Sequence, residues 1–281
     1  MTAMLDITIP NRATDAVMST ISRCALGLII ILLALAIPGC MENPRQQLIV
    51  GMELNYPPFE MIDPEGRPAG ISVEIAGALA KYLGLPLKIE NIPFDGLIPA
   101  LKTGKIDLII SSMTATAERS QSIDFSDPYL RTGLCLLVSS RASIRSIEDA
   151  DQPGHVIAVK QGTTGQLYAK MHLTHARVLA LDKEDACVLE VVQGKAQAFI
   201  YDQLSVLEDW RRNKETTNAL LKPFQEENWA IGIRKGDDRM KAKANAFLKE
   251  FRAAGGFNRL GEKYLKEQED TFHKLGIPLL F

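Results

Sequence analysis

Short apolar runs alternate with stretches of helical periodicity in the part of the chain that follows residue 47. The runs that predict strands are 48–54, 85–92 and 106–112. Between the first two, 71–84 places apolar residues at four-residue spacing and ends at a glycine, which is typical of a helix. A shorter helix is expected before Gly104. The order strand, helix, strand, helix, strand predicts an α/β layer with parallel strands and right-handed crossovers.

A second series of the same kind follows Tyr129. The ranges that predict its strands are 134–140, 156–160, 177–182, 196–202 and 228–237. The ranges that predict its helices are 161–171, 183–195 and 203–213, with two more on either side of Gly255 and Gly256. No repeat period and no low-complexity linker interrupts the chain, so the two series predict two α/β lobes packed around a cleft.

Polar clusters come where several predicted strands end, at 53–56, 111–119, 162–165 and Asp202. Ligands of open α/β layers bind beyond the carboxyl ends of the strands. In the cluster SSMTATAER, Thr116 can cap a short helical turn, and Arg119 offers a planar fork suited to a carboxylate. On spacing alone, a capped turn with a surface arginine and a site for an anion are equally good interpretations.

Composition excludes several classes of function. The chain has 281 residues, 46% hydrophobic and 23% charged, as expected of a globular protein. Its net charge of -2, without a block of Lys or Arg, argues against nucleic-acid binding. It lacks the G-x-S-x-G of serine hydrolases and the G-x-x-x-x-G-K-[ST] of P-loop ATPases. His172 and His175 have the spacing of metal ligands but no apparent third partner, so we expect neither a metal nor a cofactor.

The N-terminal segment predicts export. Arg23 precedes an uncharged apolar run, 25–37, which is too short to cross a ~30 Å hydrocarbon core but suits a secretory signal. The run ends in Pro-Gly-Cys and resembles a bacterial lipoprotein signal, which implies a leader over 1–40 and a lipid on Cys40. An uncleaved membrane anchor is the alternative, and Met18 is an alternative start. Outside the leader, Cys135 and Cys187 are expected either to pair or to be buried separately.

Blocks in three parts of the sequence resemble a known family. They read GMELNYPPFEMIDPEGRPAGISVEIAGALAKYLG, FDGLIPALKTGKIDLIISSMTATAERSQSIDFSDPY and VKQGTTGQLYAK. From about residue 48 to 267 the chain resembles the family 3 solute-binding proteins of polar amino-acid ABC importers. The resemblance implies a periplasmic binding protein type II fold, with two α/β lobes joined by a two-crossing hinge and the ligand cleft between them. Lobe 1 would be 48–132 with 229–267, lobe 2 would be 133–228, and 268–281 would be a C-terminal tail.

The resemblance also implies how the two ends of an amino acid are held. Arg119 would bind the α-carboxylate, assisted by hydroxyls and backbone N–H groups at Ser112 and Thr114, and by Thr164 from the opposite lobe. Asp202 would accept a hydrogen bond from the α-ammonium, and as the residue before a predicted helix it could also be a helix cap.

Further positions implied by the resemblance face the rest of the ligand. Tyr56 and Phe94 would flank it, with core packing as the alternative for either ring, and Glu53 would face the ligand's side chain. An acidic residue beside two rings favours a basic side chain, through charge and cation–π attraction. Glutamine and other polar ligands stay open.

We therefore expect a non-catalytic, monomeric binding protein in the periplasm or on the outer face of the cell membrane. It would be lipid-anchored and would deliver an amino acid to an ABC permease. The alternative is an enzyme on the same scaffold, resembling a cyclohexadienyl (prephenate/arogenate) dehydratase. That reaction needs a general acid in the cleft, for which Glu53 and Asp202 are the candidates.

Overall fold

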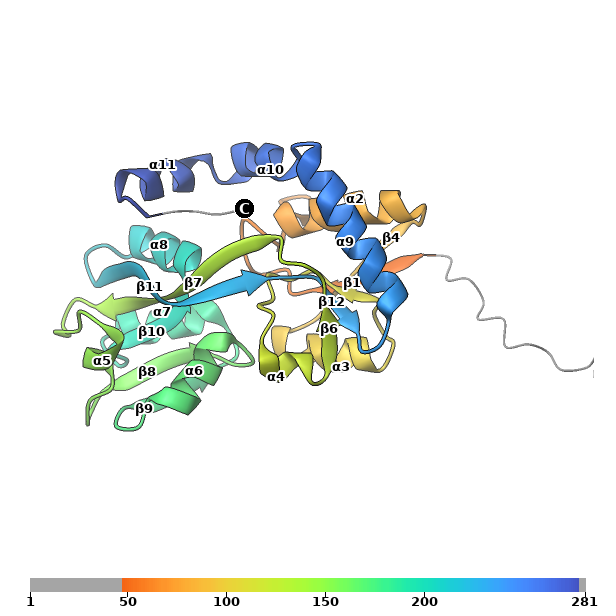
Figure 1. The fold of residues 1–281 in the computed structure, drawn as a ribbon. Coiled ribbons are helices and arrows are strands. Elements are labelled where there is room, and N and C mark those ends of the chain that lie inside the picture. The colour runs from red at the N-terminus through yellow and green to blue at the C-terminus, as the bar shows by residue number, and fades with distance from the viewer. Residues whose placement is uncertain (1–46, 278–281) are drawn as a thin grey trace, which may run out of the picture. The chain divides into compact units, whose positions relative to one another are not determined.

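The computed structural model describes residues 47–277, which contain two five-stranded sheets and a small two-stranded sheet (Figure 1). The predicted leader and Cys40 lie outside the described residues, as do the last four residues of the expected tail, 278–281.

The first sheet has the strand order β4-β1-β5-β12-β6. Its strands are β1 (Leu48–Met52), β4 (Leu87–Asn91), β5 (Leu108–Ile109), β6 (Ile123–Phe125) and β12 (Gly232–Arg234). β1 lies parallel to both β4 and β5, as the βαβ order predicts, whereas β12 is antiparallel to β5 and β6. The chain therefore returns to this sheet from far along the sequence. A hairpin of β2 (Met61–Ile62) and β3 (Pro68–Ala69) lies between β1 and the first helix.

Helices cover both faces of the first sheet (Figure 1). α2 (Ile71–Leu83) buries Ile71, Ile75 and Leu79 and ends at Gly84, whose left-handed backbone (φ 69°) suits glycine. α9 (Asp238–Ala253) packs against α2 on that face. On the other face are the 3₁₀ turn η1 (Phe94–Gly96) and α3 (Leu97–Lys102), which lies against β1, β5 and β12.

The second sheet has the strand order β11-β7-β10-β8-β9. Its strands are β7 (Leu130–Ser139), β8 (Val156–Lys160), β9 (Arg177–Leu181), β10 (Ala198–Asp202) and β11 (Thr217–Trp229). β8, β9 and β10 run parallel, while β7 is antiparallel to both of its neighbours. The carboxyl ends of β8 and β10 therefore meet at one edge of the sheet.

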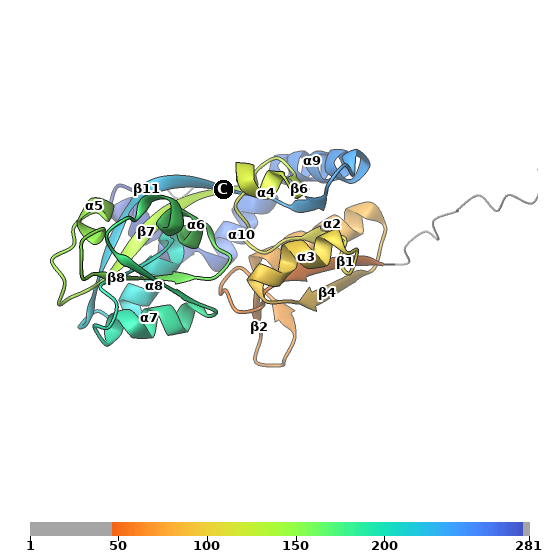
Figure 2. The same ribbon diagram turned by 90° about the horizontal axis from the view of Figure 1, so that it is seen from below.

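Helices also cover both faces of the second sheet (Figure 2). On one face, α7 (Glu184–Val192) and α8 (Gln203–Arg212) pack against β7. On the other face, α6 (Thr164–His172) packs against β8, β9 and β10, and the short α5 (Ile147–Ala150) joins the same apolar cluster.

The C-terminal helices run from one sheet's helices to the other's. Tyr264 in α10 (Gly256–Tyr264) donates a hydrogen bond to Glu74 of α2 at 2.6 Å. Gln268 in α11 (Lys266–Lys274) donates to Glu208 of α8 at 3.1 Å. The expected start of the tail at residue 268 thus falls inside α11.

Two long strands connect the sheets. β7 and β11 pair antiparallel from Trp229↔Leu130 to Thr217↔Ser139, with a register shift between Leu220 and Gln225. One end of this ribbon adjoins β12 and β6 of the first sheet, and the other end belongs to the second sheet (Figure 1).

Several sequence expectations differ from the structure. The single strand expected over 228–237 is wrong, because β11 ends at Trp229 and β12 is a separate strand in the other sheet. Cys135 in β7 and Cys187 in α7 are both buried and free, so they do not pair. Within the described part of the chain, no helix is long and apolar enough to cross a membrane.

Candidate functional site

One cavity collects side chains that follow the strand ends of both sheets. Every ligand-binding residue selected from the sequence lines it, namely Glu53, Tyr56, Phe94, Ser112, Thr114, Arg119, Thr164 and Asp202. Ser111, Thr163 and Gly165, from the predicted strand-end clusters, also line it, and the lining residues that the sequence did not reveal are Glu60, Leu134, Tyr201, Glu227 and Trp229. The cavity thus draws on segments that are far apart in the sequence.

Arg119 is positioned by a short capped helix. Thr116 caps α4 (Ala117–Ser120) through a hydrogen bond from the Arg119 amide to its hydroxyl at 3.1 Å, which confirms the predicted turn. The guanidinium donates to the carbonyl oxygen of Thr114 at 2.7 Å and to that of Gly162 at 2.9 Å. Its Cζ lies 5.5 Å from the centre of the Phe94 ring. Burial lowers the pKa of Arg119 to about 10, so it stays cationic at neutral pH.

Asp202 lies at the carboxyl end of β10 and caps α8. Its Oδ1 accepts hydrogen bonds from the amides of Leu204 at 3.0 Å and Ser205 at 3.1 Å. The side chain is buried, and this burial raises the pKa of Asp202 above its usual value. The residue therefore caps a helix and faces the cavity at once, so the cap does not exclude a binding role.

The hydroxyls selected beside Arg119 already have partners. The Ser112 hydroxyl donates to Glu60 at 3.1 Å, and the Thr114 hydroxyl donates to Glu227 at 2.9 Å. Ser112 has a positive φ of 47°, rare outside glycine, so its backbone turns sharply where β5 ends. On the other side of the cavity, Thr164 is buried as the first residue of α6.

Two buried acids among the cavity's lining residues escaped the sequence analysis. Glu60 is 1% exposed, and burial raises its pKa to about 8 despite the hydroxyl donors around it. Glu227 lies on β11 beside Arg119, and burial raises its pKa as well. Neither acid ends a predicted strand, so strand-end reasoning could not select them.

Glu53 does not stand alone at its strand end. Its Oε2 forms an ion pair with the ammonium of Lys160, the last residue of β8. Lys160 is 1% exposed, although lysine is almost never fully buried without a partner. The signal that could have revealed it is a cation at the end of the otherwise apolar strand VIAVK.

Aromatic rings form the remaining wall. Tyr56 is buried, and its ring centre lies 5.6 Å from that of Phe59 and 5.9 Å from that of Trp229. Tyr56 is therefore part of the apolar core as well as of the cavity wall, so the packing and lining interpretations hold together.

Three polar contacts join elements of the two sheets, and two of them involve the cavity-lining residues Glu53 and Arg119. They are the Glu53–Lys160 ion pair, the bond from Arg119 to the Gly162 carbonyl, and a bond from Gln161 to Asp95 at 3.2 Å. A Cβ added at Gly162 would lie 3.0 Å from the Cβ of Asp95, so the chains approach closely here.

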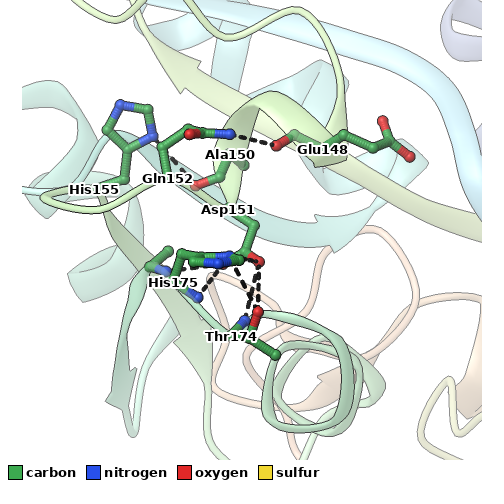
Figure 3. A network of polar contacts seen from close by, with 8 residues as sticks. Glu148, Ala150, Asp151, Gln152, His155, Thr174 and His175 are labelled. Atoms are coloured by element: carbon green, nitrogen blue, oxygen red, sulfur yellow. Dashed lines mark hydrogen bonds and ion pairs between the residues drawn. The ribbon is translucent and has the colours of Figure 1, made fainter.

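The histidines that drew attention as metal ligands lie elsewhere. His175 and Thr174 both contact the carboxylate of Asp151, which also accepts the amides of Thr174, His175 and Ala176 at 2.8–3.0 Å (Figure 3). The His172 ring instead lies 4.5 Å from the ring of Tyr168. Among residues 47–277, no group of His, Cys, Asp and Glu could hold a metal ion. This cluster therefore fastens the loop before β9 to the end of α5.

Comparison with known proteins identifies the family of this chain. Residues 48–267 match the model of the bacterial extracellular solute-binding proteins, family 3. The chain belongs to this family. Its family 3 membership implies a substrate-binding role in the periplasm or outside the cell.

Relatives of known name agree with this assignment. The L-arginine-binding protein of Pseudomonas aeruginosa is 33% identical over 76% of this chain and 86% of its own length. The ABC transporter glutamine-binding protein GlnH of Bacillus subtilis is 30% identical over 79% and 82%. Among solved structures, the ancestral amino acid-binding protein AncCDT-1, a precursor of cyclohexadienyl dehydratase, has a TM-score of 0.72 and 35% identity over 79% of this chain and 96% of its own.

The similar chains also bear on fold and catalysis. The structural likeness confirms the type II binding-protein fold, with two α/β lobes. Because the curated relatives are binding proteins of transporters, this family 3 protein is a substrate-binding protein and not an enzyme, and the dehydratase alternative is not favoured.

Proposed function

We propose that this protein captures a polar L-amino acid and delivers it to the permease of an ABC importer. The observation that carries the proposal is that Arg119 in α4 and Asp202 at the end of β10, a cation and an acid, line the same cavity. A zwitterion removed from water needs an opposite charge or a set of hydrogen bonds at each end. The names of the arginine- and glutamine-binding relatives support an amino acid as the ligand.

The carboxylate end would bind at Arg119. The guanidinium donates to the carbonyls of Thr114 and Gly162, and the ligand carboxylate would take over as the partner of this fork. Ser112, Thr114 and Thr164 line the same cavity, and their backbone amides would complete the anion's hydrogen bonds. The hydroxyls of Ser112 and Thr114 would join them on leaving Glu60 and Glu227. The exchange is favourable because a bidentate ion pair between guanidinium and carboxylate is stronger than hydrogen bonds to neutral carbonyls.

The other end and the side chain would contact the remaining walls. Asp202 would accept from the α-ammonium, and a nearby cation would draw its raised pKa back down. Tyr56 and Phe94 would flank the ligand, and Glu53 would face its side chain.

Closure of two lobes would trap the ligand. Lobe 1 would comprise 48–132 and 229–267, lobe 2 would comprise 133–228, and the paired strands β7 and β11 would form the hinge. Because Arg119 and Asp202 belong to different lobes in this scheme, only the closed form offers both charges. The ligand would therefore favour closure by binding that form more tightly.

We also propose that the protein is a monomer, exported by its N-terminal signal and anchored by a lipid on Cys40. The support is the apolar run that ends in Pro-Gly-Cys. Cell fractionation tests the anchor: the protein should stay with the membranes, and Cys40→Ser should release it. Equal membrane retention of both forms contradicts a lipid at this residue.

The ligand proposal is tested by thermal unfolding of ligand-stripped protein with each of the twenty common amino acids. A ligand at 100 times its Kd should add about 2.7 kcal/mol, which raises the Tm of a domain of this size by several degrees. No shift with any amino acid contradicts the proposal.

Arg119→Ala tests the carboxylate site. Removing one partner of a buried charge pair costs about 2–5 kcal/mol, so affinity should fall at least thirtyfold while the fold survives. Arg239→Ala, at an exposed position of α9, is the matched control and should bind normally. Near wild-type affinity in Arg119→Ala would show that the carboxylate binds elsewhere.

A further inference from the structure

Glu227 is a buried acid on the ribbon that connects the two sheets. It lies on β11, is 3% exposed, and lines the cavity. Its Oε2 accepts a hydrogen bond from the hydroxyl of Thr114 at 2.9 Å, and its Oε1 accepts from the side-chain amide of Gln225 at 3.2 Å. The segment that carries Thr114 is itself fixed to β11, because the amide of Ala115 donates to the carbonyl of Asn228 at 2.9 Å. The Glu227 carboxyl is therefore held at one position in the cavity wall.

The groups around Glu227 are those proposed for the ligand's α-carboxylate. Burial raises the pKa of Glu227, while hydrogen bonding from the side chains of Thr164 and Thr114 and the charge of Arg119 lower it. In the structure, the carboxyl of Glu227 thus uses donors from both sides of the cavity. A ligand carboxylate at Arg119 would draw on the same donors.

Two carboxylates cannot share these donors well while both are ionised. Like charges at this range repel strongly in a site sheltered from water. The Thr114 hydroxyl has a single proton to donate, so a ligand that takes this bond leaves Glu227 without it. Both changes favour a proton on Glu227. A protonated carboxyl carries an O–H donor, which can bond to the ligand's carboxylate instead of repelling it.

The other groups near Glu227 do not supply a second cation to the cavity. Arg119 is the only cation among the described residues that line it. On β7, the residue paired with Glu227 is Thr132, which is uncharged and buried. Arg131 and Glu226, which flank this pair, are exposed. The remaining titratable groups are Glu118 beside Arg119 in α4 and the cavity-lining acids Glu53, Glu60 and Asp202.

We propose that Glu227 takes up a proton from solvent when the ligand's α-carboxylate binds at Arg119, and that its neutral carboxyl then donates a hydrogen bond to that carboxylate. Glu227 gains one proton for each amino acid bound. The inference deepens the proposed function, on which it rests, because it makes Glu227 a further residue that contacts the ligand and links capture to pH.

The linkage has a definite sign. At a pH below the pKa of Glu227 in the free protein, the proton is already present and the affinity does not depend on it. As the pH rises above that pKa, the affinity should fall, by up to about tenfold per pH unit for one proton. Asp202 acts in the opposite sense, since a bound α-ammonium lowers its pKa and releases a proton. Glu60 responds as well if Ser112 leaves it, so the contribution of Glu227 is measured as a difference between variants.

Titration calorimetry counts these protons. Ligand-stripped protein is titrated with L-arginine and with L-glutamine between pH 5 and pH 8.5, at each pH in two buffers that differ in their heat of ionisation. If another amino acid gives a larger thermal shift, it replaces these two, since all twenty carry the α-carboxylate. Glu227→Gln keeps the shape of the side chain and a donor but cannot ionise. The wild-type protein should take up at least about 0.3 proton per ligand more than Glu227→Gln at one or more of these pH values.

Glu226→Gln is the matched control, because it makes the same substitution at the neighbouring, exposed position of β11. It should take up as many protons as the wild-type protein. Equal uptake by wild type and Glu227→Gln at every pH overturns the inference and leaves the amino-acid function intact. Binding of no amino acid contradicts the proposed function, and this inference with it. If Glu227→Gln does not fold, infrared difference spectra of the wild-type protein decide: binding should add the band of a protonated carboxyl, and its absence overturns the inference.

Discussion

Glu60 shows at the scale of a single residue how burial sets a charge. Its carboxyl is enclosed by the fold, with hydroxyl donors from Ser111 at 3.3 Å and Ser112 at 3.1 Å. These bonds favour the ionised form, yet the larger effect of burial raises the pKa from 4.5 to about 8. The folded protein therefore holds a proton on Glu60 at neutral pH, where the unfolded chain does not.

This raised pKa predicts a pH dependence of stability. The contribution of Glu60 is fully present below its unfolded pKa of 4.5 and is lost as the pH rises to about 8. Glu60→Gln cannot ionise, so the variant should gain stability relative to wild type between pH 5 and pH 8, by more than about 1 kcal/mol. Urea unfolding at pH 5, 6.5 and 8 measures the difference.

The control is Glu262→Gln, which removes an exposed acid of α10. Its stability difference from wild type should not change with pH. Parallel pH profiles for wild type and Glu60→Gln would contradict the buried, protonated carboxyl.

The sequence predicted residues around the cavity only where they follow the end of a predicted strand. Arg119 and Asp202 follow apolar runs, and ligands of open α/β layers bind beyond the carboxyl ends of the strands, so both could be selected as candidates. That they meet depends on how the two sheets face each other. Lys160 was counted as part of a strand, and its pairing with Glu53 depends on how two separate sheets face each other. Glu227 lies within a polar stretch that was not predicted to be a strand. The local sequence pattern does not indicate its position beside Arg119.

At the scale of elements, the short helix α4 links its N-terminal cap to the orientation of a residue that lines the cavity. Thr116 accepts the amide of Arg119, the residue whose guanidinium enters the cavity. Thr116→Ala should cost about 1 kcal/mol of stability, as is usual for a lost N-cap. It should also weaken ligand binding, because Arg119 would be less firmly oriented. Thr116→Ser keeps the accepting oxygen and should behave as wild type in urea unfolding and in calorimetry; equal behaviour of the two variants would show that the cap does not orient Arg119.

Element boundaries were predictable where the periodicity was unbroken. The strand expected over 156–160 coincides with β8, and the helix expected over 203–213 differs from α8 by one residue at its end. β11 was missed because its sequence, TNALLKPFQEENW, mixes polar residues with a proline. Pro223 falls within the register shift against β7, where the ladder does not need its absent N–H. Pairing with the apolar β7 creates this strand, which local propensity did not indicate.

At the scale of the whole described unit, Gly162 lies at a close approach between the segment after β8 and Asp95 of η1. Its φ of 76° favours glycine, and a Cβ there would lie 3.0 Å from the Cβ of Asp95 and 3.1 Å from its Cα. Gly162→Ala should therefore oppose closure and lower the affinity for every amino acid by a similar factor. The apparent Kd rises as the competent fraction falls, so the order of preference stays the same.

Gly154→Ala separates crowding from backbone strain. Gly154 has a φ of 86°, but a Cβ there would meet nothing within 4 Å. This control should lose stability, and its affinity should fall only by the amount that its larger unfolded fraction explains. A changed order of amino-acid preference in Gly162→Ala would contradict the closure argument, and calorimetry with two ligands measures it.

The close approach at Gly162 also offers a way to change the sensitivity of an amino-acid sensor built from this protein without changing its selectivity. If substitutions there shift the balance between open and closed forms without touching the ligand, they would set the concentration range of a fluorescent reporter that follows closure. Substitutions of residues that line the cavity, such as Glu53, would instead change which amino acid the reporter detects. Closure and ligand contact would then control separate properties of one sensor.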